Sequence, residues 1–195
     1  MKKKLVMTLA ICLTCASCIG IQSPYYSSGD IIQRNENITA LLSNAIHDMN
    51  FDSEEALDRA MASLLVAKEL NAFDPRIWDG MGSVEYRRGN LDKAEKHFKE
   101  AIKLNPGYDR PYMHLALIAE QRGDIIASYQ LLRLAIHKNP TNFKARNNLA
   151  VLLNKYSGTD AELKKSAHTE IVKANAINSK AALVDRNMRI IGTGK

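Results

Sequence analysis

Two prolines, Pro106 and Pro140, are surrounded by residues that repeat at the same interval as the prolines themselves. Each proline follows an asparagine, and the small and large apolar residues before it recur in register. The matching pairs are Met81 and Leu115, Gly82 and Ala116, Gly89 and Gly123, Phe98 and Leu132, and Ala101 and Ala135. A fixed period of about 34 residues is typical of repeats that each form a helix pair and bury their apolar faces against their neighbours. The sequence therefore predicts an all-α solenoid of antiparallel helix pairs.

The clearest repeat runs from residue 75 to residue 108. Its expected first helix ends before the turn Gly89-Asn90, and Asn105-Pro106 ends the second helix. The expected packing residues of this repeat are Trp78, Gly82, Ala94, Phe98, Ala101 and Pro106. In these residues the repeat resembles the tetratricopeptide repeat (TPR) family.

The residue types at these positions have a physical reason. Gly82 and Ala94 are small where two helices of a hairpin approach closely, whereas Trp78 and Phe98 are large enough to fill the gaps between hairpins. The family prefers an aromatic residue where this chain has a glutamate at position 85, and the adjacent Tyr86 is the candidate to supply that bulk.

The same pattern predicts about four repeats and a terminal cap over residues 37–192. The expected units are a degenerate repeat at 37–74, repeats at 75–108, 109–142 and 143–181, and a capping helix at 182–192. In the third unit the packing positions hold Ala116, Ala135 and Pro140. The fourth unit carries a five-residue insertion around 156–160, which we expect to lengthen a turn.

The amino terminus has the pattern of an export signal. Lys2, Lys3 and Lys4 precede an apolar stretch of nine residues, 5–13, which is far shorter than the roughly 20 residues of a spanning helix. The run Cys15-Ala16-Ser17-Cys18 resembles a bacterial lipobox, although leucine is usual where Cys15 stands. This resemblance implies a signal peptide at 1–17, acylation (palmitate) of Cys18, and a tether at 18–36.

The residue after Cys18 is Ile19 and not aspartate, which in enteric-type lipoproteins implies the periplasmic face of the outer membrane. Two alternatives remain open: Cys15 as the modified residue, or an ordinary secreted protein with incidental cysteines. The three cysteines of the chain all lie in this segment, so the domain after Cys18 has no thiol for a disulfide or a thiolate metal site.

Charge and motifs argue against several functions. The formal net charge of +6 falls to about +3 without the three leader lysines, and no basic stripe with interleaved aromatics marks a nucleic-acid binder. The sequence carries no phosphate-binding loop, nucleophile elbow or metal-ligand spacing. We expect no enzyme activity, cofactor, metal or small-molecule substrate. We also expect five solvated histidines, His47, His97, His114, His137 and His168.

The TPR resemblance also implies a partner-binding groove along the first helices. Transferred residue by residue, its positions are Arg76, Asp79, Ser83, Tyr86, Arg87, Arg110, Met113, Leu117, Glu120, Gln121, Lys144, Asn147, Val151, Asn154 and Lys155. Apolar anchors within a polar rim suit an extended or helical peptide.

Three cations in this set occupy the same position of successive repeats: Arg76, Arg110 and Lys144. Because cations at a helix N-terminus oppose the macrodipole, an acidic or C-terminal carboxylate ligand would compensate for this placement. The alternative is that this position is simply exposed and tolerates any polar residue.

These features together lead to the hypothesis of a lipid-anchored periplasmic adaptor that holds a segment of a partner protein. Among such lipoproteins the chain resembles TadD and the PilF/PilW pilus-assembly proteins, which act as pilotins or assembly factors for a secretin. The alternative is an envelope scaffold that docks cell-wall hydrolases or proteases.

Overall fold

The computed structural model describes residues 28–51 and 53–192, and within these ranges it contains helices α2 to α10 and no strand. The predicted all-α solenoid is confirmed. The predicted signal peptide, Cys18 and residues 18–27 of the predicted tether lie outside the described residues. The chain divides after Asn37 into two units, 1–37 and 38–195, which are treated separately below.

The described part of the first unit is helical, although helical periodicity was predicted only from about residue 37. Helix α2 (Ser28–Asp48) begins about ten residues before the helix that was expected near Ile38. Asp30 in its first turn interacts favourably with the helix dipole, and Gln33 donates a hydrogen bond to Asn37 one turn later (3.1 Å).

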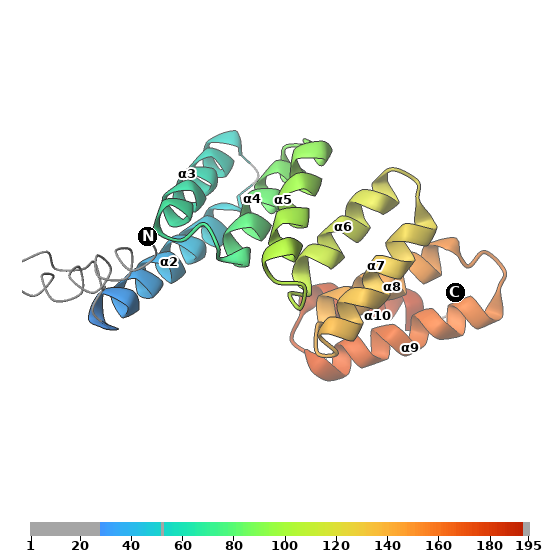
Figure 1. Cartoon of the computed structure of the whole chain (residues 1–195). Helices are drawn as coiled ribbons and strands as arrows, with labels where there is room; N and C mark the ends of the chain where they lie inside the picture. Colours follow the sequence, from blue (N-terminus) through green and yellow to red (C-terminus); the bar gives the residue numbers. More distant parts are fainter. Residues whose placement is uncertain (1–27, 52, 193–195) are drawn as a thin grey trace, which may run out of the picture. The chain divides into compact units, whose positions relative to one another are not determined.

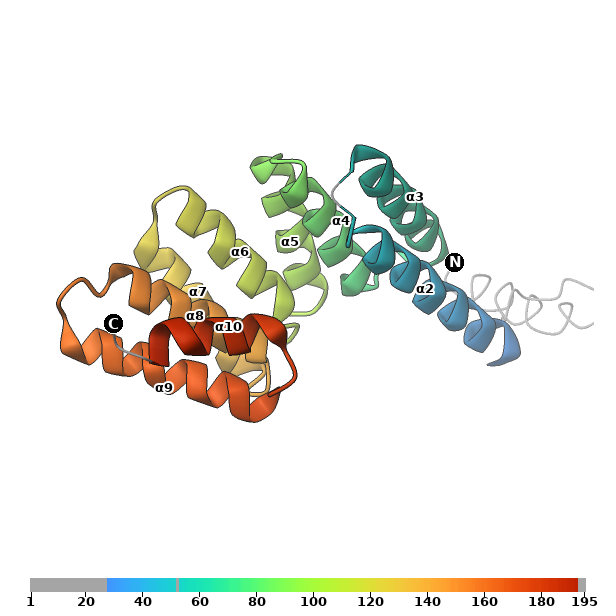
Figure 2. The same cartoon turned by 180° about the vertical axis from the view of Figure 1, so that it is seen from behind.

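The second unit is a row of helix pairs (Figures 1 and 2). The last part of α2 shares an apolar core with α3 (Glu54–Leu70) and α4 (Pro75–Arg87). Further along the chain, α4 pairs with α5, α6 with α7, and α8 with α9, and the second helix of each pair contacts the first helix of the next. Helix α10 packs on α8 and α9. The remaining bounds are α5 Leu91–Leu104, α6 Arg110–Gln121, α7 Ile125–Lys138, α8 Phe143–Tyr156, α9 Ala161–Ile177 and α10 Ala182–Gly192.

Local signals set the ends of these helices. Gly89 and Gly123 adopt φ values of 78° and 82° in the turns within two repeats, a conformation that a side chain would strain. The side chains of Asp124 and Asn142 accept hydrogen bonds from the backbone N–H groups of Ala127 and Ala145, which caps α7 and α8.

Ion pairs at another repeated position join neighbouring pairs of helices. Arg88 contacts Glu54 and Asp58 on α3. Arg122, at the same position of the next repeat, contacts Asp92 and Glu95 on α5.

The expected packing residues fall into two groups. The alanines and Phe98 are fully buried, and Gly82 lies against the Phe98 ring. Pro106 and Pro140 are exposed, so they do not pack as expected. They follow the last helical residue, where proline ends a helix because it lacks a backbone N–H. Trp78 is partly buried, and its indole nitrogen donates to the carbonyl of Ala72 (2.7 Å).

The insertion in the fourth repeat lengthens helices more than the turn, which corrects the expectation. Helix α9 has 17 residues, against 14 in α5 and in α7. Leu163 stands four residues before the buried Ala167 and is already helical. The residues four before Ala94 and Ser128 are Asn90 and Asp124, and both lie in a turn. Most of the inserted residues therefore add nearly one turn to the start of α9.

Candidate functional site

A groove of about 880 Å³ runs over the first helices of the second unit. It begins at the end of α2, crosses α4 and α6, and ends at the start of α8. Six of the predicted partner-binding residues line it: Ser83, Tyr86, Arg110, Met113, Leu117 and Lys144. Arg87, from the wider set that the resemblance implied, lines it as well.

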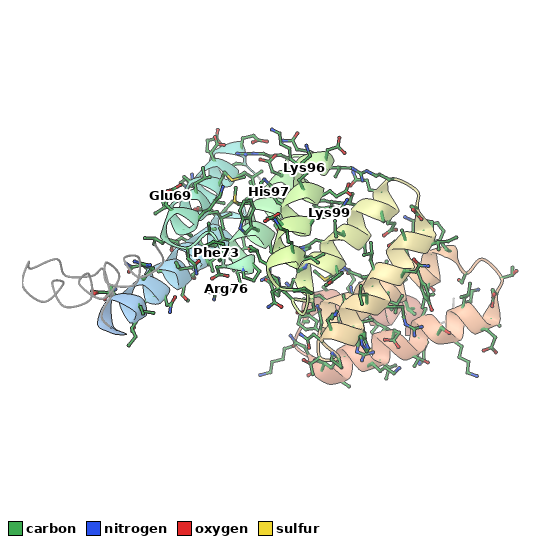
Figure 3. All side chains as sticks on the ribbon, viewed as in Figure 1. Glu69, Phe73, Arg76, Lys96, His97 and Lys99 are labelled. Atoms are coloured by element: carbon green, nitrogen blue, oxygen red, sulfur yellow. The ribbon has the colours of Figure 1, made fainter. Side chains whose placement is uncertain are left out.

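The other eight residues of the predicted site are not among those that line this groove: Arg76, Asp79, Glu120, Gln121, Asn147, Val151, Asn154 and Lys155. Asp79 and Asn147 are each only 1% exposed, so they belong to the interior. Val151 is 37% exposed on α8. The guanidinium of Arg76 pairs with both carboxylate oxygens of Asp74, with a shortest distance of 2.6 Å (Arg76 is labelled in Figure 3). The predicted row of three cations therefore has only Arg110 and Lys144 in the groove.

Beneath the groove, Asp79 contacts Tyr108 at the end of its own repeat and two side chains of the next repeat, Arg110 and His114. His114 Nδ1 lies 2.8 Å from Asp79 Oδ1, and the Tyr108 hydroxyl donates to Oδ2 at 3.2 Å. The Arg110 guanidinium lies 3.3 Å from the same Oδ2 atom. Burial alone would raise the pKa of Asp79, but His114, Arg110 and the Tyr108 hydroxyl stabilise the carboxylate, so its pKa lies below the ordinary value. A buried carboxylate thus positions one cation of the groove.

Two histidines differ from the expectation of solvated side chains. His114 is 18% exposed, and its ring lies 4.9 Å from that of Phe98. His97 packs against the ring of Trp78 at 5.8 Å, and burial lowers its pKa, although the charge of Glu85 opposes the shift. Both act as packing residues.

Residues that the sequence did not single out complete the far end of the groove. Asp109 Oδ2 accepts hydrogen bonds from the amide groups of Asn139 (3.2 Å) and Asn142 (2.5 Å). Asn142 Oδ1 in turn accepts from the backbone N–H of Ala145, which starts α8. These contacts fix the turn that carries Lys144, an exposed residue at the rim.

The first repeat also contributes lining residues that were not predicted, Ile46, Met49 and Asn50. Its sequence is degenerate, so the family positions could not be transferred to it. The sequence could have indicated that Asp79 is buried, because this aspartate stands between apolar and glycine residues in the run Ile77-Trp78-Asp79-Gly80-Met81.

Tyr86 has two roles. Its ring packs against the cluster around Phe98 and Ile118, and it also lines the groove. The neighbouring Glu85 is 6% exposed, and its carboxylate accepts from Asn90 Nδ2 at 2.8 Å. A hydrogen-bonded carboxylate therefore stands where the family prefers an aromatic ring.

The residues that line the groove combine apolar surface with more cations than carboxylates, and one of these cations, Arg110, pairs with the buried Asp79 beneath. Met49, Met113 and Leu117 supply the apolar part, and Arg87, Arg110 and Lys144 supply cations. Asp109 is the carboxylate among the lining residues that the structure describes, and two amides already bind it. This arrangement favours a ligand with apolar side chains and carboxylates.

Neither a membrane span nor a metal cluster is found in the described part of the chain. No described helix is both long and apolar enough to cross a membrane. The same residues contain no cluster of three or more histidine, cysteine, aspartate or glutamate side chains able to hold a metal ion.

Comparisons with known proteins agree with this fold. The family described as Tetratricopeptide repeat matches residues 75–108, and the family described as Est1 DNA/RNA binding domain matches residues 94–186. The TPR repeat-containing protein PA4667 of Pseudomonas aeruginosa is 33% identical over 79 residues, which is 40% of this chain. The chain spans 13% of the length of that relative.

Two solved structures are similar in fold. The structure of pilF from Pseudomonas aeruginosa aligns with a TM-score of 0.65 at 14% identity and covers 83% of this chain and 70% of pilF. The first TPR domain of Spaghetti (RPAP3), bound to an HSP90 peptide, aligns with a TM-score of 0.52 at 12% identity and covers 62% and 92% of the two chains. The chain is an all-α solenoid of helix pairs whose fold is similar to that of tetratricopeptide-repeat structures, and residues 75–108 match the tetratricopeptide repeat family itself.

Proposed function

We propose that this chain is an adaptor whose groove holds an acidic, partly apolar segment of a partner protein. The observation that carries the proposal is the groove itself, in which Met113 and Leu117 lie beside Arg110 and Lys144. A peptide in this groove would bury apolar side chains against the methionine and leucine. Its carboxylates would form charge-assisted hydrogen bonds with the two cations.

The contact between Asp79 and Arg110 supports this proposal. A guanidinium has five N–H donors, so the contacts of Arg110 with Asp79 and with the Tyr108 hydroxyl leave others for a ligand. Because Asp79 holds the arginine in place before binding, less side-chain entropy is lost when a ligand carboxylate arrives. Lys144 is an exposed side chain at the rim, so we expect it to contribute mainly through its charge.

The proposal extends to the location and the partner class. The lipobox-like run that ends at Cys18 supports a lipid-anchored protein at the periplasmic face of the outer membrane. The likeness to pilF supports a role in type IV or Flp (Tad) pilus assembly, with a secretin or another pilus or secretion component as the partner. The alternative partner class is a cell-wall hydrolase or protease that this chain docks as an envelope scaffold.

Crosslinking in intact cells, followed by purification of the full chain, tests the groove and the partner together. Lys144→Glu should reduce the captured partner severalfold, because it reverses a charge at the rim. Lys138→Glu is the matched control, since Lys138 is exposed on α7 and is not among the groove residues. Equal capture by both variants would refute binding in this groove. A secretin among the crosslinked proteins supports the pilus role, and a hydrolase or protease supports the scaffold.

The anchor is tested separately by cell fractionation. Cys18→Ala should move the protein from the membrane fraction to the soluble fraction, because acyl chains on one cysteine provide the proposed attachment. If the variant stays in the membrane fraction, the lipid assignment is wrong.

The match to an Est1 DNA/RNA binding domain calls for one further control, because arginine and lysine also bind phosphate. In a pull-down with the purified full chain and no crosslinker, addition of single-stranded RNA or DNA should leave capture of the partner protein unchanged. Competition by nucleic acid would overturn the assignment of a protein ligand.

A further inference from the structure

An ion pair that joins neighbouring repeats is replaced by apolar residues at its third position along the chain. The residues that occupy these positions are Asp58 with Arg88, Asp92 with Arg122, and Ile126 with Tyr156. The first two pairs are in contact. In the third, Ile126 remains 72% exposed and Tyr156 remains 44% exposed. The two apolar side chains therefore do not bury each other, and they leave apolar surface open to a partner.

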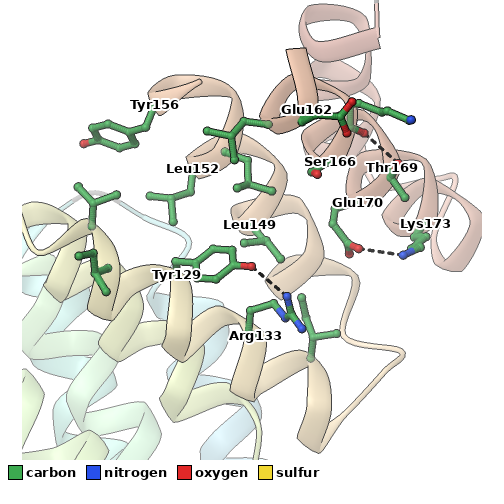
Figure 4. Close-up of a pocket in the computed structure, with 16 residues that line it drawn as sticks. Tyr129, Arg133, Leu149, Leu152, Tyr156, Glu162, Ser166, Thr169, Glu170 and Lys173 are labelled. Carbon is green, nitrogen blue, oxygen red and sulfur yellow. Dashed lines mark hydrogen bonds and ion pairs between the residues drawn. The ribbon is translucent and has the colours of Figure 1, made fainter. Parts of the chain in front are cut away.

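A cation beside this surface loses its carboxylate in the same repeat. One repeat earlier, Glu95 binds Lys99 at 2.5 Å, one helical turn away. Tyr129 and Arg133 stand at the corresponding positions. Arg133 contacts the Tyr129 hydroxyl at 2.9 Å (Figure 4), and no carboxylate in the described part of the chain pairs with it. The cation is thus kept while its carboxylate partner is removed.

The exposed apolar residues and Arg133 line a second groove, of about 810 Å³, between α7 and α9. Its floor is formed by α8, where Leu149 and Leu152 are each 2% exposed. It shares no lining residue with the groove over α4 and α6. The second groove is therefore a separate surface.

The other charged residues that line the second groove are balanced. Glu162 and Lys165 have opposite charges, and Glu170 binds Lys173 at 2.9 Å. Arg133 is the lining cation that remains for a ligand. The second groove therefore fits an apolar surface that carries a carboxylate.

A surface of this kind lies on α3 of the same chain. Leu65, Val66 and Glu69 share one face of α3 at helical spacing, and the two apolar residues are 46% and 53% exposed. Phe73, in the turn after the helix, is 80% exposed (Glu69 and Phe73 are labelled in Figure 3). Among the residues that the structure describes, no cation pairs with Glu69. This face of α3 presents apolar side chains around a carboxylate that has no partner.

We propose that α3 of one copy of this chain docks in the second groove of another copy. Glu69 supplies the carboxylate that Arg133 lacks, and the apolar side chains around it cover Ile126 and Tyr156. The contact joins two different surfaces, and every copy carries both of them. The mean mass of the protein should therefore rise with its concentration.

Sedimentation velocity of the purified full chain over a range of concentrations measures this self-association. The same detergent is used for every variant, so that an acyl chain would contribute equally to all. Arg133→Glu places a carboxylate opposite Glu69, and Glu69→Arg places a cation opposite Arg133. Each variant alone should self-associate at least about tenfold more weakly, because like charges then face each other.

A mixture of these two variants is the decisive sample. Each groove then meets an α3 face of opposite charge in the other variant, so the mixture should associate again. A chain that carries both substitutions should do the same. Recovery in the mixture also shows that both variants are folded.

A second test restores the ion pair of the preceding repeats. The double variant Ile126→Asp, Tyr156→Arg reproduces the pair formed by Asp92 and Arg122, so its Tm should match that of the unchanged chain. Its self-association should weaken at least about tenfold, because the apolar surface is lost. Ile190→Asp is the matched control, since Ile190 is 57% exposed on α10 and lines neither groove. The control should stay within about twofold of the unchanged chain.

The possible results are distinct. Self-association that each charge reversal weakens and the mixture restores supports the proposal. A monomer at every concentration overturns it, and so does an equal loss in Ile190→Asp. Loss in Arg133→Glu without loss in Glu69→Arg assigns the groove to a different occupant and also overturns it. Neither α3 nor the second groove supplies a residue to the first groove, so the outcome is independent of the proposed adaptor function.

Discussion

Replacement of Gly82 by alanine tests the closest helix contact within a repeat. A Cβ atom at this position would lie 2.6 Å from Cε1 and 2.7 Å from Cδ1 of Phe98. Real Cβ contacts are essentially never shorter than 3.0 Å, so α4, α5 or the ring must shift. The ring has little room, because Phe98 is fully buried and packs with Ala94 and Ile118.

The expected magnitude is the difference between two effects. Overpacking of a core costs about 1–3 kcal/mol. Alanine in a helix is about 0.5–1 kcal/mol more favourable than glycine. The net loss in the free energy of unfolding should be about 0–2.5 kcal/mol, centred near about 1.2 kcal/mol, and the central value corresponds to a decrease in Tm of roughly 2–5 °C for a chain of this size.

Thermal and urea unfolding of Gly82→Ala measure this loss, and Gly80→Ala is the matched control in the same helix. A Cβ at Gly80 would lie 2.7 Å from Cδ2 of Leu64, which is as buried as Phe98 but ends in methyl groups that can shift by a small rotation about χ2. The control should therefore lose less stability. In a Phe98→Leu background the alanine at position 82 should cost less, with a coupling energy of about 0.5 kcal/mol or more. A Tm of Gly82→Ala at or above that of the unchanged chain, or the same loss in both backgrounds, would refute the packing argument.

Three further predictions concern pH. The folded pKa of Asp79 is lowered, so its stabilisation is present above the unfolded value of about 3.9 and is lost as the pH falls through the folded value. Urea unfolding of Asp79→Asn should show lower stability at pH 7 and a weaker acid dependence. Burial and the charge of Asp79 raise the pKa of Tyr108, so stability should fall as the pH rises past about 10. The variant Tyr108→Phe should lose less stability over the same pH range, as measured by urea unfolding at alkaline pH. Burial lowers the pKa of His97, so stability should begin to fall below about pH 6.5. The variant His97→Gln should not show this loss of stability when Tm is measured from pH 8 to pH 5.

The fold was predictable because its signals are local and repeated. The prolines, the turn glycines and the small residues recur at one fixed interval, and each acts within its own helix pair. The degenerate first repeat was harder to delimit. The buried face of α2 is shown by Ile38, Leu42 and Ala45. The residues before them are mostly polar, and the two isoleucines among them, Ile31 and Ile32, are exposed, yet the helix continues back to Ser28. Periodicity detects the part of a helix that packs and misses the part that does not.

The candidate site was predictable only in part, because exposure depends on neighbouring repeats. Asp79 occupies a family groove position, yet Tyr108 from the end of its own repeat and His114 from the next repeat cover it and bind its carboxylate. Asn147 is similarly covered by the cap, since Asn187 donates a hydrogen bond to its side-chain oxygen at 2.9 Å. Alignment with the repeat positions of the family predicts where a residue lies on its helix. Contacts between helices decide whether its side chain is exposed to a ligand.

The three cations at the shared repeat position illustrate this difference. Arg76 donates a hydrogen bond to Asp74, which caps its own helix. Arg110 has no aspartate two residues before it, and it contacts Asp79 of the preceding repeat instead. Lys144 follows Asn142, whose side chain binds Asp109 and caps α8. The same repeat position therefore holds three cations in different surroundings. Arg76 is bound to the cap of its own helix, Arg110 is held by a buried carboxylate at the groove, and Lys144 is exposed at the rim. The binding capacity of such a row depends on the carboxylates around it, which are not repeated.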